Sequence, residues 1–258
     1  MRAQGMRLVA ALPTGVAAPA GVALVVFGIS GASLALLAAG DAGSGLPRSA
    51  GWVALFLAGW TLMTGAMMLP SSLPFLVTTQ RAGGVDASTA AGFGFTATWL
   101  AVGIVLCACL WMAGDLLGQV GPGRVEQLAA ASLMAAALYQ VSPLARSCQR
   151  ACARPFGILA QHWRGEGTPR RDALMAGLHY GMSCVGCCLA MIVLMFVFGM
   201  HDLFWMIGLG LLMVVQKHAV WGRRMALPMS AALMAAGVAI AAGWWVVPLR
   251  SLRALCGG

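Results

Sequence analysis

The chain has 258 residues, of which 60% are hydrophobic and only 9% are charged. A soluble domain carries roughly 25% charged residues, so this composition excludes an ordinary soluble enzyme or binding domain. The formal charge of +9 is typical of basic residues that flank membrane spans. No recognition motif accompanies it, so no nucleic acid partner is expected. The long apolar runs lack the alternation of a β-barrel and predict an all-α, polytopic transmembrane helical bundle in the lipid bilayer.

About seven spans are expected, because a helix needs about 20 consecutive apolar residues to cross a bilayer. Segments rich in Gly and Pro separate the apolar runs and predict turns. The fourth span is the weakest, because it is short and begins beside charged residues. The whole chain, 1–258, is expected to form a single integral membrane domain. The expected spans are 15–39, 51–77, 90–114, 124–141, 173–199, 203–221 and 226–249.

Lys and Arg are distributed unevenly between the two sides that seven spans would create. Twelve of the 16 lie in the N-terminal segment and in the second, fourth and sixth loops, when Lys217 near the end of the sixth span is counted with the sixth loop. The positive-inside rule places these segments in the cytoplasm. The N-terminus is therefore expected in the cytoplasm and Cys256, near the C-terminus, on the other side. The Arg-rich segment 142–172 becomes a cytoplasmic loop.

The second expected span contains a methionine cluster in "LMTGAMMLPSSLPF". Met63 and Met67 share one helical face, and Met68 borders it. Pro70 and Pro74 are expected to kink or unwind the helix just beyond. Methionine is a common filler of apolar cores, but its thioether is also a ligand for soft metals, so both interpretations stay open.

A cysteine pair follows the fourth span, in "SPLARSCQRACARP". Cys148 and Cys152 are four residues apart and therefore share one helical face. Arg146, Arg150 and Arg154 surround them, and nearby positive charge raises the thiolate fraction of a thiol. The pattern fits metal binding or redox exchange. It fits equally well a helix on the membrane surface whose arginines meet lipid phosphates.

Three further cysteines lie in "HYGMSCVGCC", at the start of an apolar run. Cys184, Cys187 and Cys188 fall on one helical stripe, which we expect to face the protein interior and not lipid. His179 lies about 80° from Cys187 around the helix, at about 100° per residue, so it either reaches in from the side or faces elsewhere. The glycines of this helix are expected to serve close helix packing: Gly177, Gly181 and Gly186.

The methionines and these cysteines are expected at similar depth. Counted from the cytoplasmic ends of their spans, Met67 and Cys184 lie 10 and 11 residues in, or about 15 Å at 1.5 Å per residue. Soft sulfur ligands at one level select Cu(I) among common metals. Two thiolates and a thioether around Cu(I) leave a net negative charge, which needs a cation nearby. The expected candidates for that cation are His179 and Arg146, and a protonated third thiol is the alternative to such a cation.

Four motifs run from the second span to the sixth: "AMMLPSSLP" (66–74), "LYQVSPLARSCQRACARP" (138–155), "GLHYGMSCVGCCLAMI" (177–192) and "FWMIGLGLLMVVQKH" (204–218). In these motifs the chain resembles a bacterial family of unknown function described as predicted metal-binding integral membrane proteins. The resemblance implies the bacterial inner (cytoplasmic) membrane as its location. Many members have an acidic residue where this chain has Gln216, before Lys217. The implied ligands, with His179 alongside, are Cys148, Cys152, Cys184, Cys187 and Cys188.

The expected function is the handling of a soft metal, above all copper as Cu(I), or its delivery to a membrane metalloenzyme. The chain would then act as an accessory subunit of a larger complex. No transport ATPase motif is present and no carboxylate lies deep in a span, so a chaperone is favoured over a pump. The alternatives are a thiol–disulfide redox protein, disfavoured by the depth of its "CxxC", and a purely structural subunit. Cys107 and Cys109 read as apolar filler, and no catalytic pattern favours an enzyme.

Overall fold

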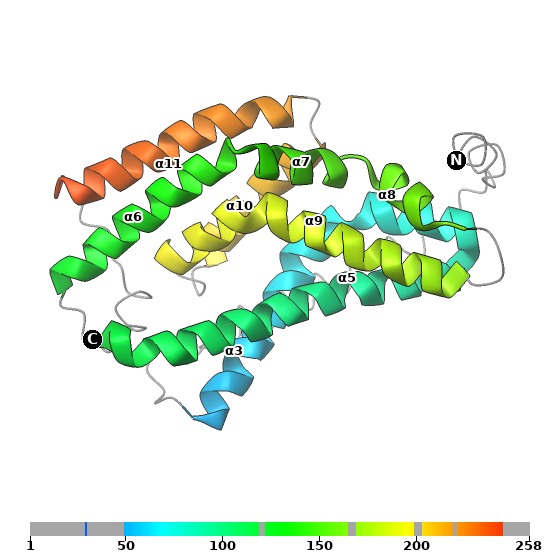
Figure 1. Cartoon of the computed structure of the whole chain (residues 1–258), viewed down its shortest axis with the longest axis horizontal. Helices are drawn as coiled ribbons and strands as arrows, with labels where there is room; N and C mark the ends of the chain where they lie inside the picture. Colours follow the sequence, from blue (N-terminus) through cyan, green and yellow to red (C-terminus); the bar gives the residue numbers. More distant parts are fainter. Residues whose placement is uncertain are drawn as a thin grey trace.

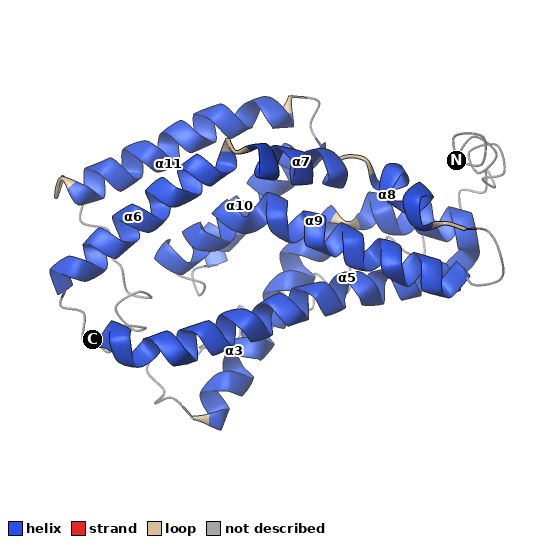
Figure 2. Ribbon diagram, viewed as in Figure 1, coloured by secondary structure: helices blue, strands red, loops and turns tan. Residues whose placement is uncertain are grey.

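The computed structural model describes Ile29 and residues 49–118, 122–164, 169–198, 203–218 and 221–244. Within these residues the regular elements are helices and no strand occurs, as Figure 2 shows. The predicted all-α fold is therefore confirmed. The first expected span, 15–39, lies outside the described residues apart from Ile29, and so does Cys256.

The second expected span is a helix that changes its winding halfway along. Helix α3 (Ala50–Met63) starts after Ser49, whose hydroxyl accepts a hydrogen bond from the Trp52 amide. It continues into a π-helical turn, η1 (Thr64–Met68), and then into the short helix α4 (Leu69–Ser71). The predicted break near the prolines is thus present, and the methionine cluster lies at the π turn, a feature that often marks functional sites.

Helix α5 (Leu73–Gly118) consists of two helical parts, which meet at a break inside the segment that was expected to be the second loop. The chain leaves helical geometry only at Gly83 and Gly84, and Gly84 has a φ of 77°. That conformation is open to glycine and costly for other residues. A side chain at Gly83 would also collide with the ring of Trp163, at 2.5 Å. The hydroxyl of Ser88 donates a 3.1 Å hydrogen bond to the carbonyl oxygen of Leu76, which a straight helix would place about 18 Å away at 1.5 Å per residue. The chain therefore folds back at the glycines, and the predicted turn is confirmed.

Helices α6 (Pro122–Gln140) and α7 (Pro143–Cys152) meet at an angle of 64°. Ser142 caps α7, because its hydroxyl accepts a hydrogen bond from the Ala145 amide. Helix α8 (Pro155–His162) follows. Both α7 and α8 pack along α9 (Pro169–Phe198), as Figure 1 shows. The segment expected to form an Arg-rich loop is thus largely helical, and it folds back onto the bundle.

Helix α9 crosses the middle of the molecule and lies along α5 (Figure 1). Glycines let the two backbones approach closely. A Cβ at Gly177 would overlap the carbonyl of Ala91, and a Cβ at Gly181 would lie 2.8 Å from Thr98. The predicted role of these glycines in helix packing is confirmed. This close packing fixes the position of α9 along α5, and with it the position of the cysteines that α9 carries.

Helix α10 (Leu203–His218) lies against α9, η1 and α4, and leads through the 3₁₀ turn η2 (Gly222–Met225) into α11 (Ala226–Ala241). Helix α11 runs beside α6 (Figure 1). At Gly237 of α11 a Cβ would lie 3.0 Å from the carbonyl oxygen of Ala130 of α6.

Three described helices are long and apolar enough to cross a membrane, and the bent α6–α7 pair would make a fourth. The apolar parts of α10 and α11 are shorter, at Gly208–Lys217 and Ala226–Ala241. The prediction of several membrane-spanning helices is therefore supported for three or four of them. The number of seven spans and the cytoplasmic N-terminus stay predictions. The candidate spans are Ala50–Ser71, Leu73–Met112 and Pro169–Val197.

Candidate metal centre

The three cysteines of α9 form a compact group inside the protein. Cys184 and Cys188 are 0% exposed and Cys187 is 6% exposed. Their Sγ atoms all lie within 4.8 Å of one another, and those of Cys187 and Cys188 are 3.5 Å apart. The prediction that this stripe faces the interior is confirmed. Three thiols that converge in this way can share one metal ion.

The cysteine pair of α7 joins this group. The Sγ of Cys152 lies 3.6 Å from that of Cys187. One turn earlier, Cys148 is half-buried against Gly186, where a Cβ would lie 2.5 Å from the Cys148 Sγ. The bend between α6 and α7 produces this contact, because it turns the cysteine face of α7 toward α9. The structure thus brings together the five cysteines that the family resemblance implied.

Tyr139, at the end of α6, fixes the bend beside the cysteines. Its hydroxyl donates a 2.7 Å hydrogen bond to the carbonyl oxygen of Gly186. That carbonyl belongs to the turn of α9 that carries Cys187. The bond therefore ties α6, and through it the start of α7, to the helix that holds the thiols.

Helix α10 contributes two residues that the sequence interpretation did not select as ligands or counter-charges. The Sγ of Cys188 lies 3.3 Å from the Sδ of Met213. The Nζ of Lys217 lies 3.0 Å from the Sγ of Cys184. Met213 and Lys217 are four residues apart and so share one helical face. The sequence feature that could have identified them is a methionine and a lysine four residues apart near the end of an apolar run.

Lys217 supplies the positive charge that a thiolate site needs. It is buried and also donates a 3.0 Å hydrogen bond to the hydroxyl of Ser71 in α4. A buried ammonium is costly unless it is paired and hydrogen-bonded, and Cys184 and Ser71 meet this need. The two residues that the sequence suggested for this positive charge lie elsewhere. Arg146 is exposed, and His179 lies within hydrogen-bonding distance of His162.

The methionines of the second span are buried near this group. Met63, Met67 and Met68 all belong to the same apolar core as the cysteines. Met67 packs against α10, since a Cβ at Gly210 would lie 3.4 Å from its methyl carbon. Gly210 is three residues before Met213, so the two are neighbours on the surface of α10. Met67 of the second span thus contacts the part of α10 that carries Met213. Binding of the metal by the thioethers of the second span stays a prediction.

His179 faces helix α8. Its Nδ1 lies 3.0 Å from the Nε2 of His162, and the two rings are nearly perpendicular, at 86°. Burial lowers the pKa of His162 below its usual value, and the neighbouring His179 lowers it further. A ligand role for His179 beside the cysteines stays a prediction.

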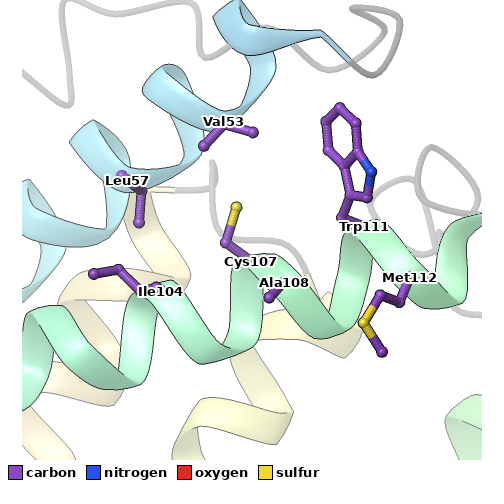
Figure 3. Close-up of a pocket in the computed structure, with 7 residues that line it drawn as sticks. All are labelled: Val53, Leu57, Ile104, Cys107, Ala108, Trp111 and Met112. Carbon is purple, nitrogen blue, oxygen red and sulfur yellow. The ribbon is translucent and has the colours of Figure 1, made fainter.

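Two cysteines of α5 lie in a different environment. Cys107 is buried and Cys109 is exposed. Figure 3 shows Cys107 pointing toward α3 across an apolar hollow of about 290 Å³ between α3 and α5. The side chains that line it are Val53, Leu57, Ile104, Cys107, Ala108, Trp111 and Met112.

The sequence profile of a family described as "PpoB2: Copper chaperone" matches residues 57–240. The match covers well over half of the chain and includes all the residues of the cysteine group. The chain therefore belongs to this copper chaperone family, and the predicted association with copper is supported at the level of the family. No curated protein and no solved structure matches the chain.

Proposed function

We propose that this member of the copper chaperone family holds Cu(I) among the sulfur atoms of α7, α9 and α10 and delivers it to a copper-using membrane protein. One observation carries the proposal: the thiols of Cys152 and Cys187, from helices distant in sequence, lie 3.6 Å apart inside the protein. Thiolates and thioethers are soft ligands that select Cu(I). Buried apolar filler would not require sulfur at each of these converging positions.

The donor set suits a low-coordinate ion. Cys188 lies between the thiol of Cys187 at 3.5 Å and the thioether of Met213 at 3.3 Å. Two thiolates and one thioether satisfy Cu(I) after these sulfur atoms spread slightly. Structural zinc sites use four tight Cys or His ligands, and the imidazole of His179 is directed toward α8. The geometry therefore favours Cu(I) over zinc.

The charges also favour a monovalent ion. Two thiolates with one Cu(I) carry a net charge of −1, and a net charge is costly in a low-dielectric interior. The ammonium of Lys217, in contact with Cys184 at 3.0 Å, balances this charge. Lys217 is then a positioning residue that stabilises the loaded site without binding the metal.

We further propose that the chain crosses the bacterial inner membrane several times, with about seven spans and a cytoplasmic N-terminus. It would act as an accessory subunit beside a metalloenzyme that receives the copper. Thiol–disulfide exchange has less support, because the attacking thiolate must be accessible and Cys184 and Cys188 are fully buried.

Copper analysis of purified protein tests this function. The protein is loaded with Cu(I) anaerobically, freed of excess metal and analysed for copper and zinc per chain. The native protein should retain copper, and the variant with Cys184, Cys187 and Cys188 changed to Ser should lose it. The matched control, Cys107→Ser with Cys109→Ser, should retain it. A native protein without copper, or a triple variant with native copper content, would refute the proposal.

A further inference from the structure

The cysteine group is closed to the surroundings except at one thiol. Cys152, Cys184, Cys187 and Cys188 are all buried, whereas Cys148 is half-buried. Its neighbours along α7, Ser147 and two arginines, are exposed. An ion on its way to the buried thiols needs a first ligand nearer the surface. The half-buried thiol of Cys148 is placed to be that ligand.

The sulfur atoms behind Cys148 form a continuous series. The Sγ of Cys152 lies 3.6 Å from that of Cys187, which lies 3.5 Å from that of Cys188. Cys188 in turn lies 3.3 Å from the Sδ of Met213. Each neighbouring pair is in van der Waals contact, so the series leads from α7 through α9 to α10 without a gap.

Gly186 lets Cys148 reach the start of this series. It precedes Cys187, and a Cβ at this position would lie 2.5 Å from the Sγ and 3.2 Å from the Cβ of Cys148. Cys148 and Cys152 are one helical turn apart on the same face of α7. Cys148 therefore lies one helical turn from Cys152 and packs against the residue that precedes Cys187, and it is less buried than either cysteine.

We infer that Cys148 is the access thiol of a sulfur relay, through which Cu(I) enters and leaves the buried site. This inference rests on the proposed function. The ion bonds to Cys148 first, then to Cys152 and Cys187, and comes to rest beside Cys188 and Met213. At each transfer the new Cu–S bond forms before the old one breaks. Copper stays in the +1 state, a thiol that binds it releases its proton, and a thiolate that releases it takes one up.

The charges around Cys148 indicate the form in which copper arrives. Arg146 and Arg150, two residues before and after it, are exposed and give this part of α7 a basic surface. A surface of one charge raises the local concentration of ligands of the opposite charge. The relay is therefore suited to an anionic Cu(I)–thiolate complex as the donor of the ion.

Transfer kinetics separate an access thiol from a resident ligand. Native protein and the Cys148→Ser variant are loaded with Cu(I), and its loss to an excess of an anionic, coloured Cu(I) chelator is followed by stopped flow. The variant should hold the native amount of copper but release it more slowly, on the order of tenfold. Loading from a Cu(I)–thiol complex should slow similarly. The control Cys109→Ser, an exposed thiol on α5, should behave like the native protein.

A second variant tests the same step with every thiol in place. In Gly186→Ala the new methyl group displaces the Cys148 side chain, so release should slow as in Cys148→Ser. Native release rates in both variants would overturn the relay while native copper content upheld the proposed function. Loss of bound copper in Cys148→Ser would make Cys148 a resident ligand and would also overturn the relay. Absence of copper from the native protein would refute the proposed function itself.

Discussion

The Nζ of Lys217 lies 3.0 Å from the Sγ of Cys184, and the same ammonium group lies 3.0 Å from the hydroxyl of Ser71. One side chain of α10 thus links the cysteine helix α9 to the broken second span. In an apolar interior neither an ammonium nor a copper–dithiolate group of net charge −1 is stable alone. The charge balance of the site therefore depends on this contact.

Replacing Lys217 should weaken copper binding without removing a ligand. In Lys217→Met the apolar chain remains and the charge is lost, so the affinity for Cu(I) should fall by about 10- to 100-fold. Lys217→Arg should recover part of this loss. Competition with a coloured Cu(I) chelator measures the affinities, and Arg171→Met, at an exposed position, is the control. An unchanged affinity in Lys217→Met would mean that the ammonium group does not balance the negative charge of the copper site.

Met213→Leu removes the thioether nearest Cys188 while nearly preserving volume. Such a change usually costs less than about 1.5 kcal/mol of stability, so the protein should fold. Its Cu(I) affinity should decrease, because Cys188 loses the sulfur 3.3 Å away. The same chelator competition measures this, with thermal unfolding as the check on folding. A native affinity would show that the site is built from thiols alone.

Changing Met63, Met67 and Met68 together to Leu tests the second span. All three are buried, and the substitution keeps the core apolar, so folding should be preserved. If their thioethers contribute ligands, the copper content of the purified variant should fall. Unchanged copper content would mean that the second span only packs against the site and that the metal belongs to the cysteines and α10.

The glycines between α5 and α9 should be sensitive to small substitutions. A Cβ at Gly177 would overlap the Ala91 carbonyl, a backbone group that cannot rotate away. Gly177→Ala should therefore destabilise the protein by about 1–3 kcal/mol. Gly59→Ala is the matched control, since a Cβ there meets nothing within 4 Å. Thermal unfolding in detergent compares the two, and equal midpoints would argue against close α5–α9 packing.

Thiol labelling of cells tests the orientation. With a cytoplasmic N-terminus, Cys256 faces the periplasm and the half-buried Cys148 is reached from the cytoplasm, while Cys152 is buried. Single-cysteine variants are treated with a membrane-impermeant reagent. Cys256 should be labelled in intact cells, and the half-buried Cys148 only after permeabilisation. Labelling of Cys148 from outside would reverse the topology.

The features that depend on a single helix, namely its type and the face on which its residues lie, could be predicted from the sequence. Spacings of three and four placed Cys184, Cys187 and Cys188 on one face, and the apolar surroundings put that face inside. The glycines of α9 were recognised for the same reason. Helix type and helix face follow from periodicity, so these features needed no knowledge of the tertiary structure.

The parts that were missed depend on how helices meet. Counting depth along straight spans left Cys152 in a loop, whereas the 64° bend between α6 and α7 brings it to Cys187. Met213 and Lys217 gain their roles only because α10 packs against α9. The orientation of His179 was ambiguous around the helix, and its partner, His162, lies on a separate helix.

X-ray absorption spectroscopy of the Cu(I)-loaded native protein tests the central claim most directly, because it reports both the oxidation state and the ligand atoms of the metal. The account predicts a Cu(I) edge and a first shell of sulfur alone, both lost when Cys184, Cys187 and Cys188 are changed to Ser. A first shell dominated by nitrogen or oxygen, or the same sulfur shell in the triple variant, would contradict it.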